Sequence, residues 1–186
     1  MPAGERLGIF GGTFDPPHDA HLLAARAARN QLGLDRVLFV VARQPWQKQG
    51  AVVASAADRL AMSHLAFDGQ DGMEVSDLEI RRDGPTYTAD TLEALSEPGR
   101  GLFLIVGADA ASRLASWVRS GRVRELAEIA VAPRAGYEID EGAAIEMAPV
   151  ELSSTTIREQ LAAGLRPAGV NPRVSDYIAE HGLYRR

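Results

Sequence analysis

The stretch L-G-I-F-G-G-T-F-D-P-P-H-D-A-H, residues 7–21, decides the fold class because it leads from a strand through a tight turn directly into a helix. Its first four residues form an apolar run that ends in two glycines, which is typical of a strand and its exit turn. Leucines and alanines at helical spacing along residues 19–32 predict a helix with one buried face, ended by Gly33. A strand followed by a helix is the unit from which parallel sheets are built.

The same alternation of strand and helix continues along the chain. Residues 36–41 (R-V-L-F-V-V) and 102–106 (L-F-L-I-V) are nearly continuous apolar runs, as expected of strands buried on both faces of a sheet. Ser55 begins a capping pattern, and Asn171-Pro172 places a proline at a first helical position. Further strands are expected at residues 74–80, 129–132 and 145–148. Further helices are expected at residues 55–67, 89–95, 109–115, 123–127 and 172–181. Another helix, capped by Ser154 or Thr155, is expected to reach about residue 163. The chain is therefore predicted to be an α/β protein with a single doubly wound, mostly parallel sheet and C-terminal helices, one domain over residues 1–186.

Composition and charge limit the function class. The chain has 186 residues, 46% of them hydrophobic, which is enough to bury one good core. Its net charge of −5 argues against a nucleic-acid-binding protein, and the lack of cysteine excludes disulfides, thiolate catalysis and thiolate metal sites. No apolar stretch reaches the length of a signal-peptide core or a membrane span. We therefore expect a cytoplasmic protein without nucleic-acid or membrane partners, as a monomer or homo-oligomer.

Four segments are expected to share one edge of the predicted sheet. In doubly wound sheets, ligands bind over the carboxyl ends of the strands, where the chain changes direction across the sheet. The segments placed there are residues 11–21, 44–48 and 107–109, together with 153–158 if the helix that follows packs nearby. Their agreement predicts a single binding site.

Residues 11–21 favour a site for an anion. Gly11-Gly12 lets the backbone approach a ligand closely or adopt a positive φ, and Pro16-Pro17 fixes the approach to the helix. His18 and His21 then project from one side of the first helical turn, where free amides and the positive end of the helix dipole also attract anions. A lone histidine is usually a satisfied polar residue, but two at this spacing favour a functional interpretation.

Other classes of site lack their signatures. No third histidine, cysteine or acidic residue lies at a convincing spacing for a metal site, so none is predicted. The G-x-G-x-x-G fingerprint of redox dinucleotide-binding domains and the G-x-x-x-x-G-K-[ST] phosphate loop are both absent. A dehydrogenase is therefore disfavoured.

The run G-G-T-F-D-P-P-H-D-A-H resembles the T/H-x-G-H signature of the nucleotidylyltransferase superfamily, and the chain is similar to the bacterial nicotinate-nucleotide adenylyltransferases in particular. The first motif and the serine-threonine motif are specific to the superfamily, and G-P-T-Y-T-A-D-T-L is specific to the family. The likeness covers nearly the whole chain, through residues 10–21, 44–48 (Q-P-W-Q-K), 84–92 (G-P-T-Y-T-A-D-T-L), 106–109 (V-G-A-D), Trp117, 153–158 (S-S-T-T-I-R) and 182–185 (G-L-Y-R).

The resemblance implies a Rossmann-like nucleotidylyltransferase fold and transfer of the adenylyl group of ATP to nicotinic acid mononucleotide. The products would be nicotinic acid adenine dinucleotide, an intermediate of NAD biosynthesis, and pyrophosphate, with Mg²⁺ accompanying ATP. Such a reaction needs groups that position the substrates and stabilise charge on the phosphate oxygens, and it needs no protein nucleophile. That requirement agrees with a chain that has no cysteine.

The resemblance also implies roles for individual residues. It assigns catalysis to His18, His21, Lys48 and Arg158. Lys48 lies in an expected loop, and the Arg158 guanidinium can donate two hydrogen bonds to one phosphate group. ATP is expected to contact Gly11, Gly12, Thr13, Phe14, His18, His21, Gly107, Asp109, Ser154, Thr155 and Arg158. Taken singly, several of these residues have ordinary alternatives, since Ser154 or Thr155 can cap a helix and Lys48 can be a solubilising charge.

The mononucleotide is expected to contact a second group of residues. We expect its pyridine ring to stack on Trp117 and its carboxylate to accept hydrogen bonds from Thr86 and Tyr87. Asp109, which is suited to ribose hydroxyls, and Arg134 complete this set. A site built for a carboxylate should disfavour the amide analogue.

Three departures from the family pattern keep alternatives open. Ala20 stands where the signature has glycine, Arg134-Ala135-Gly136 lacks a central proline, and the segment over residues 136–149 is shorter than is common. A pantetheine-phosphate or nicotinamide mononucleotide adenylyltransferase is the nearest alternative enzyme, against which residues 84–92 and Trp117 argue. A non-catalytic nucleotide-binding module, suggested by Ala20, is the alternative of another class.

Overall fold

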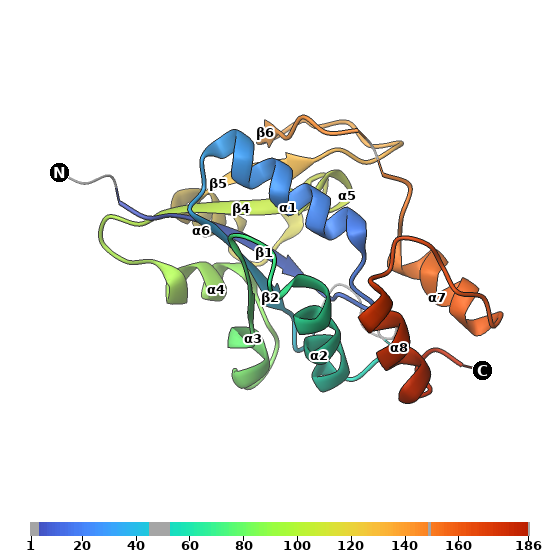
Figure 1. Ribbon diagram of the computed structural model, residues 1–186. Coiled ribbons are helices and arrows are strands. Elements are labelled where there is room, and N and C mark those ends of the chain that lie inside the picture. Colours follow the sequence, from blue (N-terminus) through green and yellow to red (C-terminus); the bar gives the residue numbers. More distant parts are fainter. Residues whose placement is uncertain (1–3, 45–52, 149, 186) are drawn as a thin grey trace.

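The computed structural model describes residues 4–44, 53–148 and 150–185. Its strands form one six-stranded sheet in the order β3-β2-β1-β4-β5-β6, and every neighbouring pair is parallel. The prediction of a doubly wound, mostly parallel sheet with C-terminal helices is confirmed (Figure 1). The strands are β1 (Arg6–Gly12), β2 (Arg36–Val41), β3 (Met73–Ser76), β4 (Gly101–Gly107), β5 (Ala127–Ala132) and β6 (Ala143–Ala144).

Helices cover both faces of the sheet. The long helix α1 (Asp19–Leu32) lies across one face, and α2 (Ala56–Phe67) packs on that side with α8 (Pro172–Glu180) (Figure 1). The opposite face carries α4 (Thr88–Leu95), α5 (Ala108–Ala111), the 3-10 turn η2 (Leu114–Ser116) and α6 (Ser120–Leu126). Two further helices are α3 (Leu78–Arg81) and α7 (Ser154–Ala162). No helix among the described residues is long and apolar enough to cross a membrane.

The apolar runs of the strands supply two hydrophobic cores, one on each face. In β2, Val37, Phe39 and Val41 join the core under α1 and α2, while Leu38 and Val40 join the core under α4 and α6. Because side chains alternate along a strand, a continuous apolar run is what a strand buried on both faces requires. This is the pattern that the sequence predicted for residues 36–41.

Three expected elements differ from the structure. The strand predicted over residues 74–80 is wrong in its second half, because β3 ends at Ser76 and the chain turns into the short helix α3. The Ser76 hydroxyl accepts a hydrogen bond from the amide of Leu78 at 3.2 Å and so favours this turn. The helix expected over 109–115 is divided into α5 and η2, and the last strand lies at β6 rather than at residues 145–148.

The helix caps are partly as expected. Ser55 caps α2 by accepting from the amide of Asp58 at 3.1 Å, and Asn171 caps α8 with Pro172 at its start. The prediction that Ser154 or Thr155 caps α7 is wrong. Ser153 is the cap, since its hydroxyl accepts from the amide of Thr156 at 3.1 Å, which leaves the Ser154 and Thr155 side chains in the first turn for other contacts.

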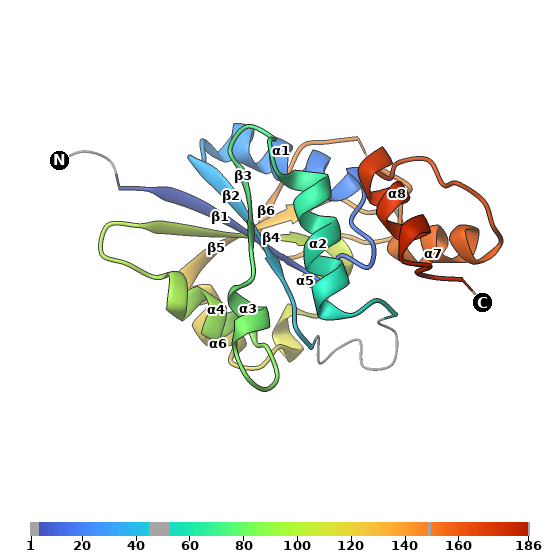
Figure 2. The same cartoon turned by 60° about the horizontal axis from the view of Figure 1, so that its bottom comes forward.

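The strand order places a change of direction beside β1. From β1 the chain builds β2 and β3 on one side, then crosses to β4 and continues through β5 and β6 on the other. The carboxyl ends of β1 and β4 are therefore the point at which a doubly wound sheet binds ligands. The C-terminal helices α7 and α8 lie beyond this end of the sheet, away from the N-terminus (Figures 1 and 2).

Candidate functional site

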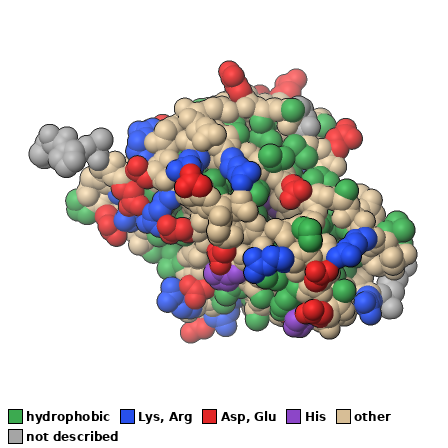
Figure 3. Space-filling view, in the orientation of Figure 1, with side chains coloured by type: hydrophobic (Ala, Val, Ile, Leu, Met, Phe, Trp, Pro, Cys, Tyr) green, Lys and Arg blue, Asp and Glu red, His purple; other side chains and the backbone are tan. Residues whose placement is uncertain are grey.

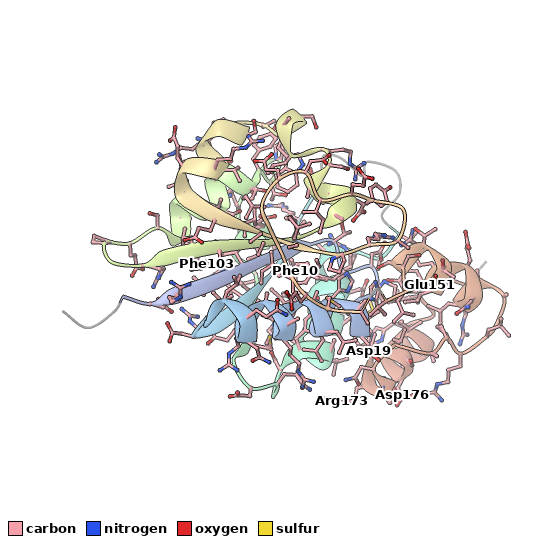
Figure 4. The ribbon with its side chains drawn as sticks, turned by 90° about the horizontal axis from the view of Figure 1, so that it is seen from above. Phe10, Asp19, Phe103, Glu151, Arg173 and Asp176 are labelled. Carbon is pink, nitrogen blue, oxygen red and sulfur yellow. The ribbon has the colours of Figure 1, made fainter. Side chains whose placement is uncertain are left out.

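Two pockets meet at the carboxyl ends of β1 and β4. Their common wall is formed by residues at the end of β1 and the start of α5, and Figure 4 shows one of them, Phe10, near the middle of the molecule. We call the pocket of about 440 Å³ the large pocket and that of about 180 Å³ the small pocket. The shared residues are Phe10, Gly11, Gly12, Thr13, Gly107 and Ala110.

The turn after β1 gets its shape from Phe14 as well as from the two glycines. A Cβ placed on Gly11 would meet no atom within 4 Å, while one on Gly12 would come within 2.6 Å of the Phe14 ring. Neither glycine has a positive φ, so that part of the expectation is wrong. Phe14 itself has a φ of 50° and is buried, which turns the chain while its ring closes the space behind Gly12.

His18 and His21 stack against each other at the entrance to α1 and line the large pocket. Their ring centroids are 3.7 Å apart with the planes inclined by 25°. The backbone N–H of His18 donates to Nδ1 of His21 at 3.2 Å. Because Nδ1 of His21 is an acceptor in this bond, the hydrogen of the neutral imidazole is on Nε2.

Two of the amides expected to be free at this helix start are already engaged. The amide of His18 bonds to His21, and the amide of Asp19 donates to the carbonyl of Gly169 at 2.8 Å. Figure 4 shows Asp19 at the end of α1 that lies beside the C-terminal helices. The imidazoles, more than these amides, are therefore the groups that α1 offers to a ligand.

Burial keeps His18 uncharged in the absence of a ligand. Its side chain is 6% exposed, and desolvation together with the nearby Arg134 guanidinium lowers its pKa from 6.5 to about 4. Nδ1 of His18 has no hydrogen-bond partner among the residues that the structure describes. A buried polar atom without a partner at the wall of a pocket is a candidate for ligand contact.

The helix α7 contributes the next part of the large pocket, where Ser154, Thr155 and Arg158 are among the lining residues. The Ser154 hydroxyl donates to the carbonyl of Pro16 at 3.0 Å, and Nη1 of Arg158 donates to the carbonyl of Asp15 at 2.8 Å. These bonds fix the start of α7 against the turn before α1. The expectation that residues 153–158 join the segment after β1 is therefore confirmed.

A buried network behind the turn was missed by the sequence analysis. Asp15 is 2% exposed and accepts hydrogen bonds from the Tyr184 hydroxyl at 2.7 Å and from the amides of Val53 and Ala54 at 2.8 and 3.1 Å. Burial and the Asp15 carboxylate raise the pKa of Tyr184, which therefore remains a hydrogen-bond donor. The only sequence signals were Asp15 inside the turn motif and the terminal G-L-Y-R.

A second buried side chain supports the same turn. Arg59 of α2 is 1% exposed, and its guanidinium donates to the carbonyls of Thr13 at 2.8 Å, Ala42 at 2.7 Å and Arg43 at 3.0 Å. It therefore joins the ends of β1 and β2. These contacts connect residues far apart in the chain, so no local motif announces them.

The far wall of the large pocket carries a pair of opposite charges. Nη1 of Arg134, just after β5, lies 3.2 Å from Oδ2 of Asp109. Asp109 is the acidic residue among the described residues that line this pocket, whereas its basic side chains are Arg134, Arg158, His18 and His21. Two guanidinium groups against one carboxylate suit an anionic ligand such as a polyphosphate.

The small pocket has a different chemistry. Trp117 and Thr86 line it together with Glu79, Thr88 and Thr91, and much of its remaining wall is apolar. Nε1 of Trp117 is buried without a hydrogen-bond partner among the described residues. An aromatic ring, hydroxyl groups and an unpaired indole N–H suit a flat ring with a polar substituent.

The structure does not describe one of the remaining expected residues and places two others differently from the prediction. Lys48 lies outside the described residues, as does most of the segment 44–48. Tyr87 precedes α4 and is not among the described residues that line either pocket, and Arg134 lines the large pocket rather than the small one. The described part of the chain holds no group of three or more His, Cys, Asp or Glu side chains suited to a metal ion.

The surface seen in Figure 3 carries charges of both signs side by side. Exposed ion pairs among the described residues include Arg122 with Glu93 at 3.0 Å and Arg166 with Asp176 at 2.5 Å. Exposed pairs of this kind contribute little to stability.

Comparison with known proteins adds the family to this geometry. Residues 9–160 match the family model described as cytidylyltransferase-like. The chain is 41% identical over 195 residues to a protein of Saccharopolyspora erythraea named "Probable nicotinate-nucleotide adenylyltransferase", covering 100% of this chain and 92% of that one. It is 44% identical over 188 residues to the protein of the same name from Thermus thermophilus, covering 97% and 100%.

Solved structures show the same fold. A nicotinic acid mononucleotide adenylyltransferase of Plasmodium falciparum, solved in complex with NaAD, superposes with a TM-score of 0.81 at 20% identity over 97% of both chains. The two sequence relatives, at 41% and 44% identity, share more residues with this chain than the solved structure does at 20%. Together with the family model they show that the chain belongs to the cytidylyltransferase-like family and, within it, to the nicotinate-nucleotide adenylyltransferases.

Proposed function

We propose that the chain transfers the adenylyl group of ATP to nicotinic acid mononucleotide, forming nicotinic acid adenine dinucleotide and pyrophosphate. The observation that carries this proposal is that two pockets of different chemistry meet at the end of β1. The large pocket is lined by His18, His21 and Arg158, whereas the small one is lined by Trp117 and Thr86. Two nucleotides bound one in each pocket would have their phosphates adjacent at the shared wall.

The reaction is a displacement at the α-phosphorus of ATP. A 5′-phosphate oxygen of the mononucleotide forms the new P–O bond, and the bond from the α-phosphorus to the bridging oxygen of pyrophosphate breaks, so that its electron pair leaves with pyrophosphate. No protein atom is bonded in this sequence, so the protein's contribution is positioning and charge stabilisation. Gly11, where an added Cβ would meet open space, leaves room for this exchange.

In the large pocket, the imidazoles donate to phosphate oxygens. His21 is oriented for this by the bond to its Nδ1, which leaves its Nε2–H as the donor. His18 is neutral without ligand and gains affinity for a proton beside a triphosphate, because an anion offsets the burial that lowers its pKa. Arg158 supplies a fixed cation, and Ser154 and Thr155 lie at the positive end of α7.

In the small pocket, Trp117 packs on the pyridine ring and Thr86 binds its carboxylate. Asp109 and Arg134 lie across the large pocket, where we assign them to ribose hydroxyls and phosphate groups near the junction. We assign to Gly12, Thr13 and Gly107 the role of shaping the shared wall, and to Phe14 that of lining the large pocket beside it. Tyr87 and Lys48 remain predicted contacts of the carboxylate and of the β- and γ-phosphates.

The divalent metal accompanies ATP as part of the substrate. The described residues provide no cluster of metal ligands, and Mg²⁺ is commonly held by substrate phosphates with few protein groups. We therefore assign Mg²⁺ to the triphosphate oxygens as part of the substrate. Bound there, it would neutralise charge on the leaving pyrophosphate. A cytoplasmic location, one domain over residues 1–186, a monomer or homo-oligomer, and the absence of a nucleic-acid partner stay predictions.

Pyrophosphate release tests the proposal. The enzyme is incubated with Mg-ATP and either nicotinic acid mononucleotide or its amide, and the product is identified by mass. We expect pyrophosphate release when ATP and a mononucleotide are both present. We also expect a higher kcat/KM for nicotinic acid mononucleotide than for its amide. A higher kcat/KM for the amide would identify a nicotinamide mononucleotide enzyme instead. Tight ATP binding without any pyrophosphate would indicate a non-catalytic module.

A further inference from the structure

The small pocket contains a carboxyl group that the reaction described above does not use. Glu79, on the short helix α3, lines this pocket and is 7% exposed. Oε1 of Glu79 accepts a hydrogen bond from the Thr91 hydroxyl at 2.6 Å. Thr86 lines the same pocket, and its hydroxyl favours the ionised form of the Glu79 carboxyl group, which lowers the pKa of Glu79 against the effect of burial. Glu79 is thus influenced by the residue assigned to the ring carboxylate.

Glu79 has no ion-pair partner among the described residues. The charged groups that act on it are Arg82, which favours its ionised form, and Asp90 of α4, which opposes that form. Arg82 is partly engaged elsewhere, since its Nη2 donates to the carbonyl of Asp90 at 3.3 Å. Burial is the largest influence and raises the pKa of Glu79.

The hydrogen of the Thr86 hydroxyl has two competing acceptors. Oγ1 of Thr86 lies 3.4 Å from the carbonyl oxygen of Gln44, and the Thr86 hydroxyl also acts on the Glu79 carboxyl group, whose pKa it lowers. An ionised Glu79 has only acceptors and takes this hydrogen for itself. A neutral Glu79 carries its own hydrogen, which it can donate to Oγ1 of Thr86, and the Thr86 hydrogen is then available to another acceptor.

A ligand carboxylate in the small pocket makes this difference decisive. Two carboxylates close together in a buried site do not both remain ionised at low cost, and such pairs share a proton. The amide analogue brings no negative charge and places no such demand on Glu79. The protonation of Glu79 therefore affects the binding of the acid mononucleotide but not the binding of the amide.

We propose that Glu79 is a specificity-determining residue of the small pocket, which holds a proton while the ring carboxylate is bound and thereby frees the Thr86 hydroxyl to donate to that carboxylate. This inference rests on the proposed function, in which the small pocket takes the pyridine ring. It adds that selection of the acid over the amide depends on pH through one side chain. A purely structural role for Glu79, as an acceptor for Thr91, would produce no such dependence.

The test compares the dissociation constants of the two mononucleotides by titration calorimetry between about pH 5.5 and pH 9. Both carry the same 5′-phosphate, so titration of that group cancels in the ratio of the two constants. We expect the preference for the acid to decline by up to about tenfold per pH unit above the pKa of Glu79, with proton uptake on binding the acid but not the amide. Proton uptake is measured by repeating the titration in buffers of different ionisation enthalpy.

Three variants make the assignment specific. In Glu79→Gln the ratio of the dissociation constants of the two mononucleotides should be independent of pH. Binding of the acid should then involve no more proton uptake than binding of the amide. In Thr91→Val the decline should move to higher pH, because the lost hydrogen bond stabilised the ionised form of Glu79. Glu93→Gln, the same change of charge at an exposed position of α4, should behave as the wild type.

The outcomes separate this inference from the proposed function. If the wild type releases pyrophosphate with the acid but shows a flat ratio and no proton uptake, the role of Glu79 is overturned while the function stands. The same holds if Glu79→Gln keeps the wild-type pH dependence. If neither mononucleotide binds or supports pyrophosphate release, the proposed function itself fails. Thermal melting of each variant confirms that it is folded.

Discussion

The backbone N–H of His18 donates to Nδ1 of His21 at 3.2 Å, and the two imidazole rings stack with centroids 3.7 Å apart. This arrangement is a helix cap in which one histidine holds the next in a defined tautomer. Nε2 of His21 is the donor that remains, and its ring position is fixed by packing against Phe14 at 5.1 Å between centroids. A structural bond thus fixes the ring orientation of a side chain that lines the large pocket.

Replacement of either histidine should reduce turnover. We expect His18→Ala and His21→Ala each to lower kcat by about a hundredfold or more, the usual effect of losing one donor to transition-state charge. His64→Ala, on the exposed side of α2 where the imidazole pairs with Asp68, is the matched control and should leave kcat unchanged. Steady-state kinetics would decide, and unchanged turnover in both pocket variants would remove the histidines from the mechanism.

The buried His18 should make stability depend on pH. Its pKa is about 4 in the folded protein and about 6.5 when unfolded, so the unfolded chain binds more protons between these values. The free energy of unfolding should therefore be highest above pH 6.5 and decrease as the pH falls towards 4, by on the order of 3 kcal/mol from this residue. Urea unfolding at both ends of this window should show a smaller decrease for His18→Gln. An equal decrease in the two proteins would contradict the assignment.

Arg158 should contribute to the binding of ATP. A charge-assisted hydrogen bond is typically stabilising by about 1.5–3 kcal/mol, so Arg158→Ala should lower kcat/KM for ATP by about ten- to hundredfold. The control is Arg166→Ala, which removes an exposed guanidinium that pairs with Asp176 and lines neither pocket among the described residues. Equal effects of the two substitutions on kcat/KM would show that only the net charge matters.

Trp117 should act on the acceptor and not on ATP. Its ring lines the small pocket and is not among the described residues that line the large one. Trp117→Ala is therefore expected to raise KM for the mononucleotide about tenfold through lost stacking, with a smaller change for ATP. Tyr137→Ala removes an exposed aromatic side chain and serves as the comparison. A larger rise in KM for ATP than for the mononucleotide would mean that the two pockets are assigned the wrong way round.

The Ala20→Gly substitution tests the effect of the Ala20 methyl group at the position where the family signature has glycine. It lines the large pocket in the first turn of α1, and Ala20→Gly is expected to lower KM for ATP while lowering the free energy of unfolding by up to about 1 kcal/mol. Ala27→Gly on the same helix should show a loss of stability without the change in KM. A higher KM for ATP in Ala20→Gly would indicate that the methyl group helps binding.

Strong local patterns predicted the frame of the fold. The apolar run of β2 matched its observed bounds, Arg36–Val41, and the amphipathic pattern of α1 matched Asp19–Leu32, because burial on both faces or on one face leaves a direct trace in the sequence. The rule that ligands bind at the carboxyl ends of parallel strands then brought residues 11–21, 107–109 and 153–158 to one place. The large pocket includes residues from all three.

The parts that sequence reasoning missed depend on contacts between distant residues. The sequence predicts a strand over residues 74–80 that includes Glu79, whereas β3 ends at Ser76 and Glu79 lies on the short helix α3. Its place in the small pocket follows only from the turn after Ser76. Likewise Asp15 and Tyr184, which are 169 residues apart, meet through a hydrogen bond that no local pattern encodes.

The structure of the enzyme crystallised with nicotinic acid adenine dinucleotide would test the central claim most directly. The claim is that two nucleotides bind in adjoining pockets and react at the wall formed by residues 10–13. We predict the pyridine ring in the small pocket against Trp117, the adenosine in the large pocket, and the bridging phosphates between them beside His18 and His21. A dinucleotide bound in the opposite direction, or bound away from the end of β1, would contradict the account.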